Sequence, residues 1–255
     1  MNQTSSNTHR PWLRFLVRLA STFCAMSGFR LERLNVVWVV SGALSLIGAH
    51  ALMKLSNPNL IAGYWVLTLS MYYVGNSFIL ASRRIPGALI ARFGEDSALR
   101  IYDTALGLMF LNQGLGVSCM GSLAWSGDAS LFSSSTTAIG IVFFAIGLVT
   151  KIWATMLVGV DIYYYHDMFL GRPTGGFVSS GPYRFLANPM YGVGQLHAYG
   201  YGLLTGSIVG LAAAAVCHSA IYVFYFVVER PFVRRSFPAG SKDDLFESSA
   251  GTAAP

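Results

Sequence analysis

The amino-acid sequence predicts an all-α integral membrane protein of about six transmembrane helices, including a C-terminal helical hairpin and an N-terminal interfacial helix. Hydrophobic residues make up 54% of the chain and charged residues only 11%, whereas soluble domains carry about 25% charged residues. The apolar residues gather into runs of about 20, the length of helix that crosses a hydrocarbon core of ~30 Å. Arginines and lysines cluster between alternate runs, as the positive-inside rule expects of a multi-pass protein.

Four apolar runs and one longer stretch account for the predicted crossings. The runs are 35–53, 60–81, 101–125 and 136–160, and the stretch is 191–228. This stretch is too long for one crossing, and the sequence Leu-Thr-Gly-Ser at 204–207 interrupts it. Because Gly and Ser favour turns, we expect a hairpin of two shorter passes there. Before the first run, residues 11–34 interleave Trp, Leu and Phe with arginines, which is typical of an interfacial helix.

The charges of the loops predict the orientation of these crossings. Basic residues flank every second loop: Arg10, Arg14, Arg18, Arg30, Arg33, Arg83, Arg84, Arg92, Arg100, Arg172, Arg184, Arg230, Arg234, Arg235 and Lys242. The alternate loops hold Lys54 and Asp128. Both termini and the long 161–190 loop should therefore face the cytoplasm, at the endoplasmic reticulum or a bacterial cytoplasmic membrane.

The net charge of +6 does not indicate nucleic acid binding. The basic residues sit at membrane borders rather than in one patch, so the lipid bilayer and its anionic headgroups are the expected partners. Cys24, Cys119 and Cys217 lack metal-ligand spacing, and no metal site is expected. The first two spans could brace the core or form a homo-oligomer contact. Their small residues, Gly42, Gly48, Gly63 and Gly75, would allow either kind of helix packing.

Polar and aromatic residues concentrate in the C-terminal part of the chain, after Gly147. Their segments are GLVTKIWA at 147–154, DIYYYHD at 161–167, GPYRFLANPMY at 181–191 and ERPF at 229–232. This order resembles the membrane-embedded S-adenosylmethionine-dependent methyltransferases, which include the phosphatidylethanolamine N-methyltransferases and the isoprenylcysteine carboxyl methyltransferases. The third segment is similar to their G-P-[YF]-[RK]-x-x-x-[HN]-P-x-Y signature. Its asparagine form is closest to the phospholipid branch.

The resemblance implies a domain organisation and a cofactor site. Residues 1–34 would form a cytoplasmic tail and interfacial helix, 35–135 accessory transmembrane helices, 136–238 the methyltransferase-like core and 239–255 a disordered tail. S-adenosylmethionine would be bound by Tyr183, Arg184, Asn188, Pro189, Tyr191, Gly192, Gly194 and Glu229. Two departures are visible, since the family usually has a second Glu where this chain has Arg230, and often an Arg where it has Lys151. We include Arg230 in the predicted cofactor site at that position.

Physical chemistry gives these residue types a purpose of their own. A sulfonium cofactor carries an ammonium, a carboxylate and an adenine, so its site needs a carboxylate, a basic group, small residues and aromatic faces. Glu229 is the sharpest candidate, because an acid placed mid-bilayer costs roughly 2.5–3.5 kcal/mol. An intramembrane histidine, His197, joins the predicted cofactor site, with a packing role nearly as well supported. Free backbone N–H groups near Gly192 and Gly194 could meet the cofactor carboxylate.

Lys151 is expected about ten residues inside its span, or ~15 Å of helix rise, which snorkelling only partly covers. We therefore predict a partner for it: Glu229, Asp161 or the phosphate of a bound lipid. Lys151, Tyr163, Arg172 and Tyr199 form the predicted substrate site, because cations hold phosphate and aromatic faces hold methylated ammonium groups. Tyr163 also fits an aromatic belt at the membrane border.

The predicted function is in-line transfer of a methyl group from S-adenosylmethionine to the amine of a phospholipid such as phosphatidylethanolamine. An ammonium must first lose a proton, and Glu229 suits the cofactor's charged groups better than the amine. His166 and Asp167, expected in an exposed cytosolic loop, or water would then accept the proton. Alternatives are methylation of a prenylcysteine carboxylate, a sterol reductase, and a transporter or non-catalytic lipid-binding protein.

Overall fold

The computed structural model describes residues 11–123, 133–176 and 178–236, and every element in these ranges is helical. The predicted all-α class is therefore confirmed for the described part of the chain. The N-terminal tail before Pro11, the predicted disordered tail at 239–255, and Asp128 and Lys242 lie outside the described residues.

The elements of the first half of the chain are α1 (Pro11–Met26), η1 (Leu31–Arg33), α2 (Val36–Leu55), α3 (Pro58–Leu69), the π-helical η2 (Ser70–Gly75), α4 (Asn76–Ser82), α5 (Arg84–Phe93) and α6 (Glu95–Gly121). This half packs mainly through α6, which contacts α2, α3 and α5. Asparagine side chains cap two of the starts, since Asn35 accepts from the Trp38 N–H and Asn57 accepts from the N–H groups of Asn59 and Leu60.

The second half begins with one long helix and ends with another. Its elements are α8 (Ser134–Val158), α9 (Val160–Tyr163), α10 (His166–Leu170), η3 (Gly181–Arg184), η4 (Val193–Gln195), α11 (Leu196–Leu204), α12 (Ile208–Phe224), the π-helical η5 (Tyr225–Glu229) and α13 (Arg230–Ser236). The predicted break of the last stretch is confirmed, because α11 ends at Leu204 and Ser207 caps α12 by accepting from the Gly210 N–H.

Three helical stretches are long and apolar enough to cross a membrane: Val36–Leu55, Ser134–Val158 and Ile208–Ser236. They support an integral membrane protein, and about six crossings remain a prediction. The first arm of the C-terminal hairpin is short, because the nine residues of α11 rise only ~14 Å at 1.5 Å per residue.

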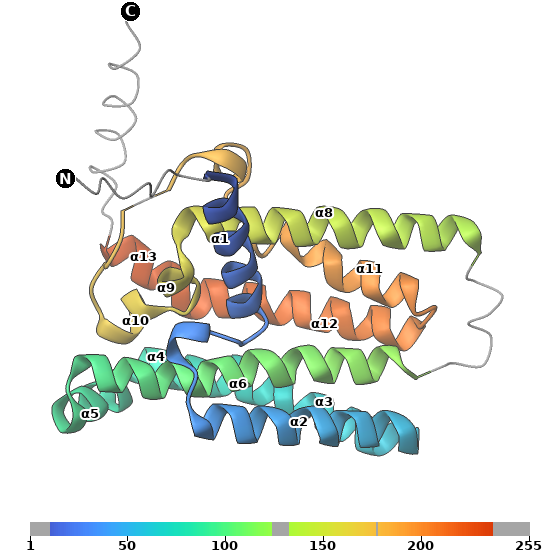
Figure 1. Ribbon diagram of the computed structural model, residues 1–255, viewed down its shortest axis with the longest axis horizontal. Coiled ribbons are helices and arrows are strands. Elements are labelled where there is room, and N and C mark those ends of the chain that lie inside the picture. The colour runs from blue at the N-terminus through green and yellow to red at the C-terminus, as the bar shows by residue number, and fades with distance from the viewer. Residues whose placement is uncertain (1–10, 124–132, 177, 237–255) are drawn as a thin grey trace, which may run out of the picture.

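The long helices lie side by side in one bundle (Figure 1). Helix α6 packs against α2 and α3 on one side and against α12 on the other, and α8 packs along α11. Helix α1 crosses in front of the bundle (Figure 1), packs against α8 and α9, and is followed by a turn that meets α6. There, Gly28 has a φ of +93°, and a Cβ on it would lie 2.2 Å from the Gly107 carbonyl oxygen, so two backbones meet directly.

The predicted interfacial segment, 11–34, is only partly one helix. Helix α1 ends at Met26, and a turn and η1 follow it. Trp12, Leu13 and Phe15 are each about half exposed, as expected of a helix with an apolar face for the membrane interface. Its location at that interface stays a prediction.

Candidate functional site

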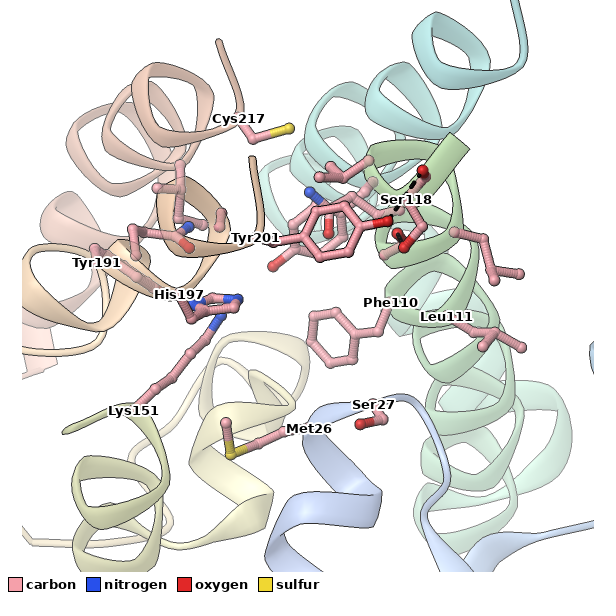
Figure 2. Close-up of a pocket in the computed structure, with 18 of the residues that line it drawn as sticks. Met26, Ser27, Phe110, Leu111, Ser118, Lys151, Tyr191, His197, Tyr201 and Cys217 are labelled. Carbon is pink, nitrogen blue, oxygen red and sulfur yellow. Dashed lines mark hydrogen bonds between the residues drawn. The ribbon is translucent and has the colours of Figure 1, made fainter. Parts of the chain in front are cut away.

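A central cavity of about 360 Å³ lies inside the bundle, between α6, α8, α11 and α12 (Figure 2). Its volume falls within the ~300–1,000 Å³ of typical ligand sites. Residues that line it include Phe110, Gln113, Lys151, Tyr191, His197 and Cys217. A cavity lined by several polar groups, inside an otherwise apolar bundle, is the best candidate for a binding site.

Lys151 projects from α8 into the central cavity, with its amino group directed towards His197 (Figure 2). No carboxylate among the described residues lies within ion-pair distance of it. Two of its predicted partners are thereby excluded as ion-pair partners, since Asp161 pairs with Arg30 and Glu229 is bound by Tyr191. Of the predicted partners, an anionic ligand is left for this cation.

His197 is held by the Gly194 carbonyl and by the contact of its backbone with α8. Its Nδ1 lies 2.6 Å from the Gly194 carbonyl oxygen; this contact requires Nδ1 to carry the proton in the neutral ring, which leaves Nε2 as an acceptor. A Cβ at Gly147 would lie 2.2 Å from the backbone nitrogen of His197, so α8 and α11 touch through this glycine. The imidazole is therefore held with one nitrogen available beside Lys151.

The segment that joins η3 to α11 is a compact turn. Asn188 accepts from the Tyr191 N–H at 3.3 Å through its side chain and from the Gly192 N–H at 3.0 Å through its carbonyl. The Gly194 N–H donates to the Pro189 carbonyl at 2.8 Å. The expectation of free N–H groups at Gly192 and Gly194 is wrong, because the turn itself uses both. What the turn does present to the cavity is the Tyr191 side chain.

Tyr191 belongs to a chain of hydroxyl groups that ends on Glu229. Its hydroxyl donates to Glu229 Oε2 at 2.7 Å and lies 3.3 Å from the Tyr165 hydroxyl, which lies 3.1 Å from the Tyr72 hydroxyl. All three tyrosines are buried and line the central cavity. We call Tyr72, Tyr165 and Tyr191 the hydroxyl chain. It connects the cavity to the carboxylate that the sequence singled out.

Two further predicted residues lie near Glu229. The Tyr183 hydroxyl is buried without a hydrogen-bond partner, and burial, followed by the nearby Glu229 charge, raises the pKa of Tyr183. Arg230 lies over the Phe226 ring, with its guanidinium 5.5 Å from the ring centre. Arg184 is exposed and lies over Phe185 in the same way, at 5.7 Å. Neither arginine lines the central cavity.

His166 and Asp167 are not in an exposed loop, so that expectation is wrong. They are 4% and 7% exposed, respectively. The His166 Nε2 lies 2.6 Å from Asp103 and 3.1 Å from Arg30, which also forms an ion pair with Asp161. We call Arg30, Asp103, Asp161 and His166 the ion cluster. Within it, Arg30 pairs with both aspartates and His166 bonds to Asp103, so the buried charges of Arg30 and Asp103 have partners of opposite charge.

Asp167 binds within its own loop, where one carboxylate oxygen accepts hydrogen bonds from both the N–H and the hydroxyl of Thr174. Neither His166 nor Asp167 lines the central cavity. Their predicted role as proton acceptors is therefore not favoured by the geometry. The long 161–190 segment folds back onto the bundle through α9 and α10 instead of forming an open loop.

The other two predicted substrate residues lie elsewhere. Tyr199 bonds to His218 Nδ1 at 3.0 Å, and Arg172 pairs with Glu95 at 2.6 Å on the surface. Arg172 also lines a second cavity, of about 810 Å³, together with Leu80, Arg83, Val228, Phe232 and Arg235. We call this the border cavity, because its arginines mark the basic border of the bundle. It touches η5 one residue before Glu229.

The structure thus brings together Lys151, Tyr163, Tyr191 and His197 in the central cavity, with Glu229 one hydrogen bond away. Sequence reasoning missed Tyr72, Gln113 and Gln195, which line the same space, and treated Tyr165 as one of three tyrosines at the membrane border, where aromatic belts are common. The two glutamines carried a usable signal, since buried amides are rare in apolar spans. The tyrosines did not, because aromatic residues are common near membrane borders.

Residues 135–240 match the family model described as phospholipid methyltransferase. The resemblance to the membrane-embedded methyltransferases is confirmed for this segment. It contains Lys151, the turn from Asn188 to Gly194, His197 and Glu229, whereas α6, which supplies the opposite wall of the central cavity, lies outside it. No solved structure gives a significant match to the chain.

Curated relatives include three fungal proteins named phosphatidylethanolamine N-methyltransferase. That of Schizosaccharomyces japonicus is 34% identical over 97 residues, which are 37% of this chain and 11% of the relative. The Schizosaccharomyces pombe protein is 32% identical over 98 residues, 38% of this chain and 11% of the relative. The Laccaria bicolor protein is 25% identical over 247 residues, 84% of this chain and 26% of the relative. The chain thus spans between about a tenth and a quarter of these relatives.

Proposed function

We propose that the protein transfers a methyl group from S-adenosylmethionine to the amine of a membrane phospholipid, phosphatidylethanolamine or a methylated derivative of it. The observation that carries this proposal is the central cavity, where Lys151, a cation without a carboxylate partner among the described residues, faces His197 and Tyr191 inside the segment that matches the phospholipid methyltransferases. The names of the fungal relatives support the phospholipid over a prenylcysteine as acceptor.

The residues around the central cavity fit a sulfonium donor in their chemistry. Aromatic faces from Tyr163 and Tyr191, amides from Gln113 and Gln195, and the free nitrogen of His197 meet the needs of an adenosyl and amino-acid moiety. Bound S-adenosylmethionine would supply an electrophilic methyl group. In this proposal, Asn188, Pro189, Gly192 and Gly194 position Tyr191, whose hydroxyl binds Glu229.

Lys151 suits the phosphate of the acceptor lipid. A phosphate held there would compensate the cation inside the bundle. Tyr163 lines the cavity as an aromatic face for an amine that already carries methyl groups.

The border cavity offers a route for the lipid headgroup. Arg83 is held in place by donating to the carbonyls of Met168, Phe169 and Leu170, while Arg172 and Arg235 line the same space. Arg184 and Arg230 lie on aromatic rings in the C-terminal segment, and we assign them to the same charged border. Lipid phosphates are attracted to such arginines. With cytoplasmic termini, as the loop charges predict, the soluble donor would enter from the cytosol.

The protein's own contribution to the reaction would be alignment and exclusion of water. An apolar bundle keeps water from the reacting groups, and fixed donor and acceptor positions supply much of the rate enhancement in such transfers. No covalent intermediate with the protein is needed.

Two measurements on the purified full chain test this proposal. Isothermal calorimetry should detect S-adenosylmethionine binding, and labelled methyl groups should pass to phosphatidylethanolamine in vesicles. Phosphatidylcholine, whose quaternary nitrogen cannot accept a methyl group, is the control lipid, and a prenylcysteine is the alternative acceptor. Binding that fails in both detergent and vesicles would refute the proposal, and transfer only to prenylcysteine would replace its substrate.

A further inference from the structure

The hydroxyl chain has features that packing alone does not require. Tyr72 lies in the π-helical η2 and Glu229 in the π-helical η5, two segments far apart in sequence. Single π turns are rare and often occur at functional sites. Tyr165, the middle residue of the hydroxyl chain, has a φ of +57°, which is unusual for a bulky residue. The local backbone therefore departs from the ordinary at each position that aligns these hydroxyl groups except Tyr191.

The direction of the hydrogen bonds follows from a count of protons. A tyrosine has one hydroxyl proton, and that of Tyr191 goes to the Glu229 carboxylate. The bond between Tyr191 and Tyr165 must then use the proton of Tyr165, and the bond between Tyr165 and Tyr72 that of Tyr72. All three O–H groups point towards Glu229. The Tyr72 oxygen keeps its lone pairs at the cavity end of the chain.

We propose that the hydroxyl chain carries the proton of the lipid ammonium from the central cavity to Glu229, with Tyr72 as the group that touches the substrate. This inference rests on the proposed function. The ammonium gives its proton to the Tyr72 oxygen as the hydroxyl protons of Tyr72, Tyr165 and Tyr191 each move one oxygen onward. The last proton arrives on the Glu229 carboxylate. The lipid amine is then neutral, with its nitrogen lone pair free, and Glu229 is a carboxylic acid.

The balance of this step is complete without a further reactant. Each tyrosine loses one proton and gains one, so all three remain neutral, and one positive charge leaves the amine as one negative charge disappears from Glu229. The hydrogen bonds end in the reverse direction, with Glu229 donating to Tyr191. Loss of the proton from Glu229 to water at the border of the bundle, followed by rotation of the hydroxyls, restores the starting state.

This path replaces the proton acceptors that the sequence suggested. His166 is bound within the ion cluster and Asp167 by Thr174, and neither lines the cavity. Other titratable groups around the path are Lys151 on α8, His197 on α11, Cys217 on α12, Tyr73 in η2, Tyr163 at the end of α9, Tyr183 in η3, Arg83 after α4 and Arg230 in α13. Of the described side chains, only Glu229 combines a negative charge with a hydrogen bond to a residue lining the cavity.

The first test needs no methyl donor. Infrared difference spectra of the full chain in vesicles should show a protonated carboxyl band on addition of phosphatidylethanolamine, and no band with phosphatidylcholine, which has no N–H proton. The band should be absent from Glu229→Gln and from Tyr72→Phe. A band of unchanged size in Tyr72→Phe would overturn the proposal, even if methyl transfer by the native protein failed.

The second test uses the pH dependence of methyl transfer. Tyr72→Phe should lower the rate by ~10²-fold near neutral pH, the usual worth of general base catalysis. Its rate should then rise about tenfold per pH unit as the amine loses its proton to water, whereas the native profile is flatter. Tyr64→Phe, which loses a hydroxyl bound to Asn112 away from the cavity, is the matched control and should keep the native rate and profile.

A uniform loss at every pH in Tyr72→Phe, with donor binding and thermal stability intact, would mean that Tyr72 only shapes the cavity. It would refute the proton path but leave the methyltransferase proposal standing. Absence of methyl transfer in the native protein under all conditions would instead count against the proposed function, with the infrared result still deciding on the path.

Discussion

The Tyr191 hydroxyl donates to Oε2 of Glu229 at 2.7 Å across 38 residues of sequence. This bond joins the turn after η3 to the π-helical end of the last long helix. A double-mutant cycle of Tyr191→Phe and Glu229→Gln should give a coupling of about 1–2 kcal/mol, because hydrogen bonds to charged groups are worth about 1.5–3 kcal/mol. Thermal unfolding in one detergent measures it, and purely additive effects would show that the two side chains are not coupled.

Lys151→Met should separate stability from ligand binding. The change removes a charge that has no carboxylate partner among the described residues, so the melting temperature should stay the same or rise. The affinity for the phospholipid should fall at least tenfold, about 1.4 kcal/mol or more, because its phosphate loses a cation. Lys151→Arg should retain most of the binding. A melting temperature that falls with unchanged lipid affinity would make Lys151 a structural residue.

Asp103→Asn should be among the most destabilising single changes in the described part of the chain. Asp103 is 2% exposed and contacts both Arg30 and His166. Breaking a buried ion pair typically costs about 3–5 kcal/mol, because the remaining charge is left uncompensated. Glu95→Gln is the control, since it breaks the surface pair with Arg172 and should cost less than about 1 kcal/mol. Thermal unfolding of the two variants should differ clearly; equal losses would argue against a buried cluster.

Gly147→Ala should disturb the central cavity from outside it. The added Cβ would lie 2.2 Å from the backbone nitrogen of His197, so α8 and α11 must move apart. We expect a loss of ~1–3 kcal/mol in stability and reduced donor binding. Gly63→Ala is a matched control, because its Cβ would meet nothing within 4 Å. If calorimetry finds native donor affinity in Gly147→Ala, the contact of α8 with α11 does not shape the site.

Much of this fold could be predicted because it depends on short stretches of sequence, such as apolar runs and turn residues. Apolar runs gave the positions of the long helices, and the Leu-Thr-Gly-Ser segment gave the hairpin turn that Ser207 caps. The observed helix boundaries differ from the apolar runs where a helix includes charged residues. Helix α6 begins at Glu95, six residues before the apolar run at Ile101, because acidic residues are favourable in a first turn.

The candidate site could be predicted only in part. Lys151 and His197 stood out because polar groups in apolar spans are rare, and both line the central cavity. The ion cluster could not be predicted, because it brings Arg30 to His166 across 136 positions. Tyr72 meets Tyr165 across 93 positions in the same way. Such pairings depend on how helices pack, and no spacing in the sequence reveals them.

The contact of Gly28 with Gly107 joins the turn after α1 to α6, and the ion cluster joins both to the C-terminal segment. Just beyond that contact, Arg30 reaches Asp103 on one side and Asp161 on the other. A fragment limited to residues 135–240 would keep Asp161 and His166 while losing Arg30 and Asp103, which bind them. The family segment of this chain is therefore not a portable module, and grafting it onto another set of helices would require the graft to bring α1 and α6 with it.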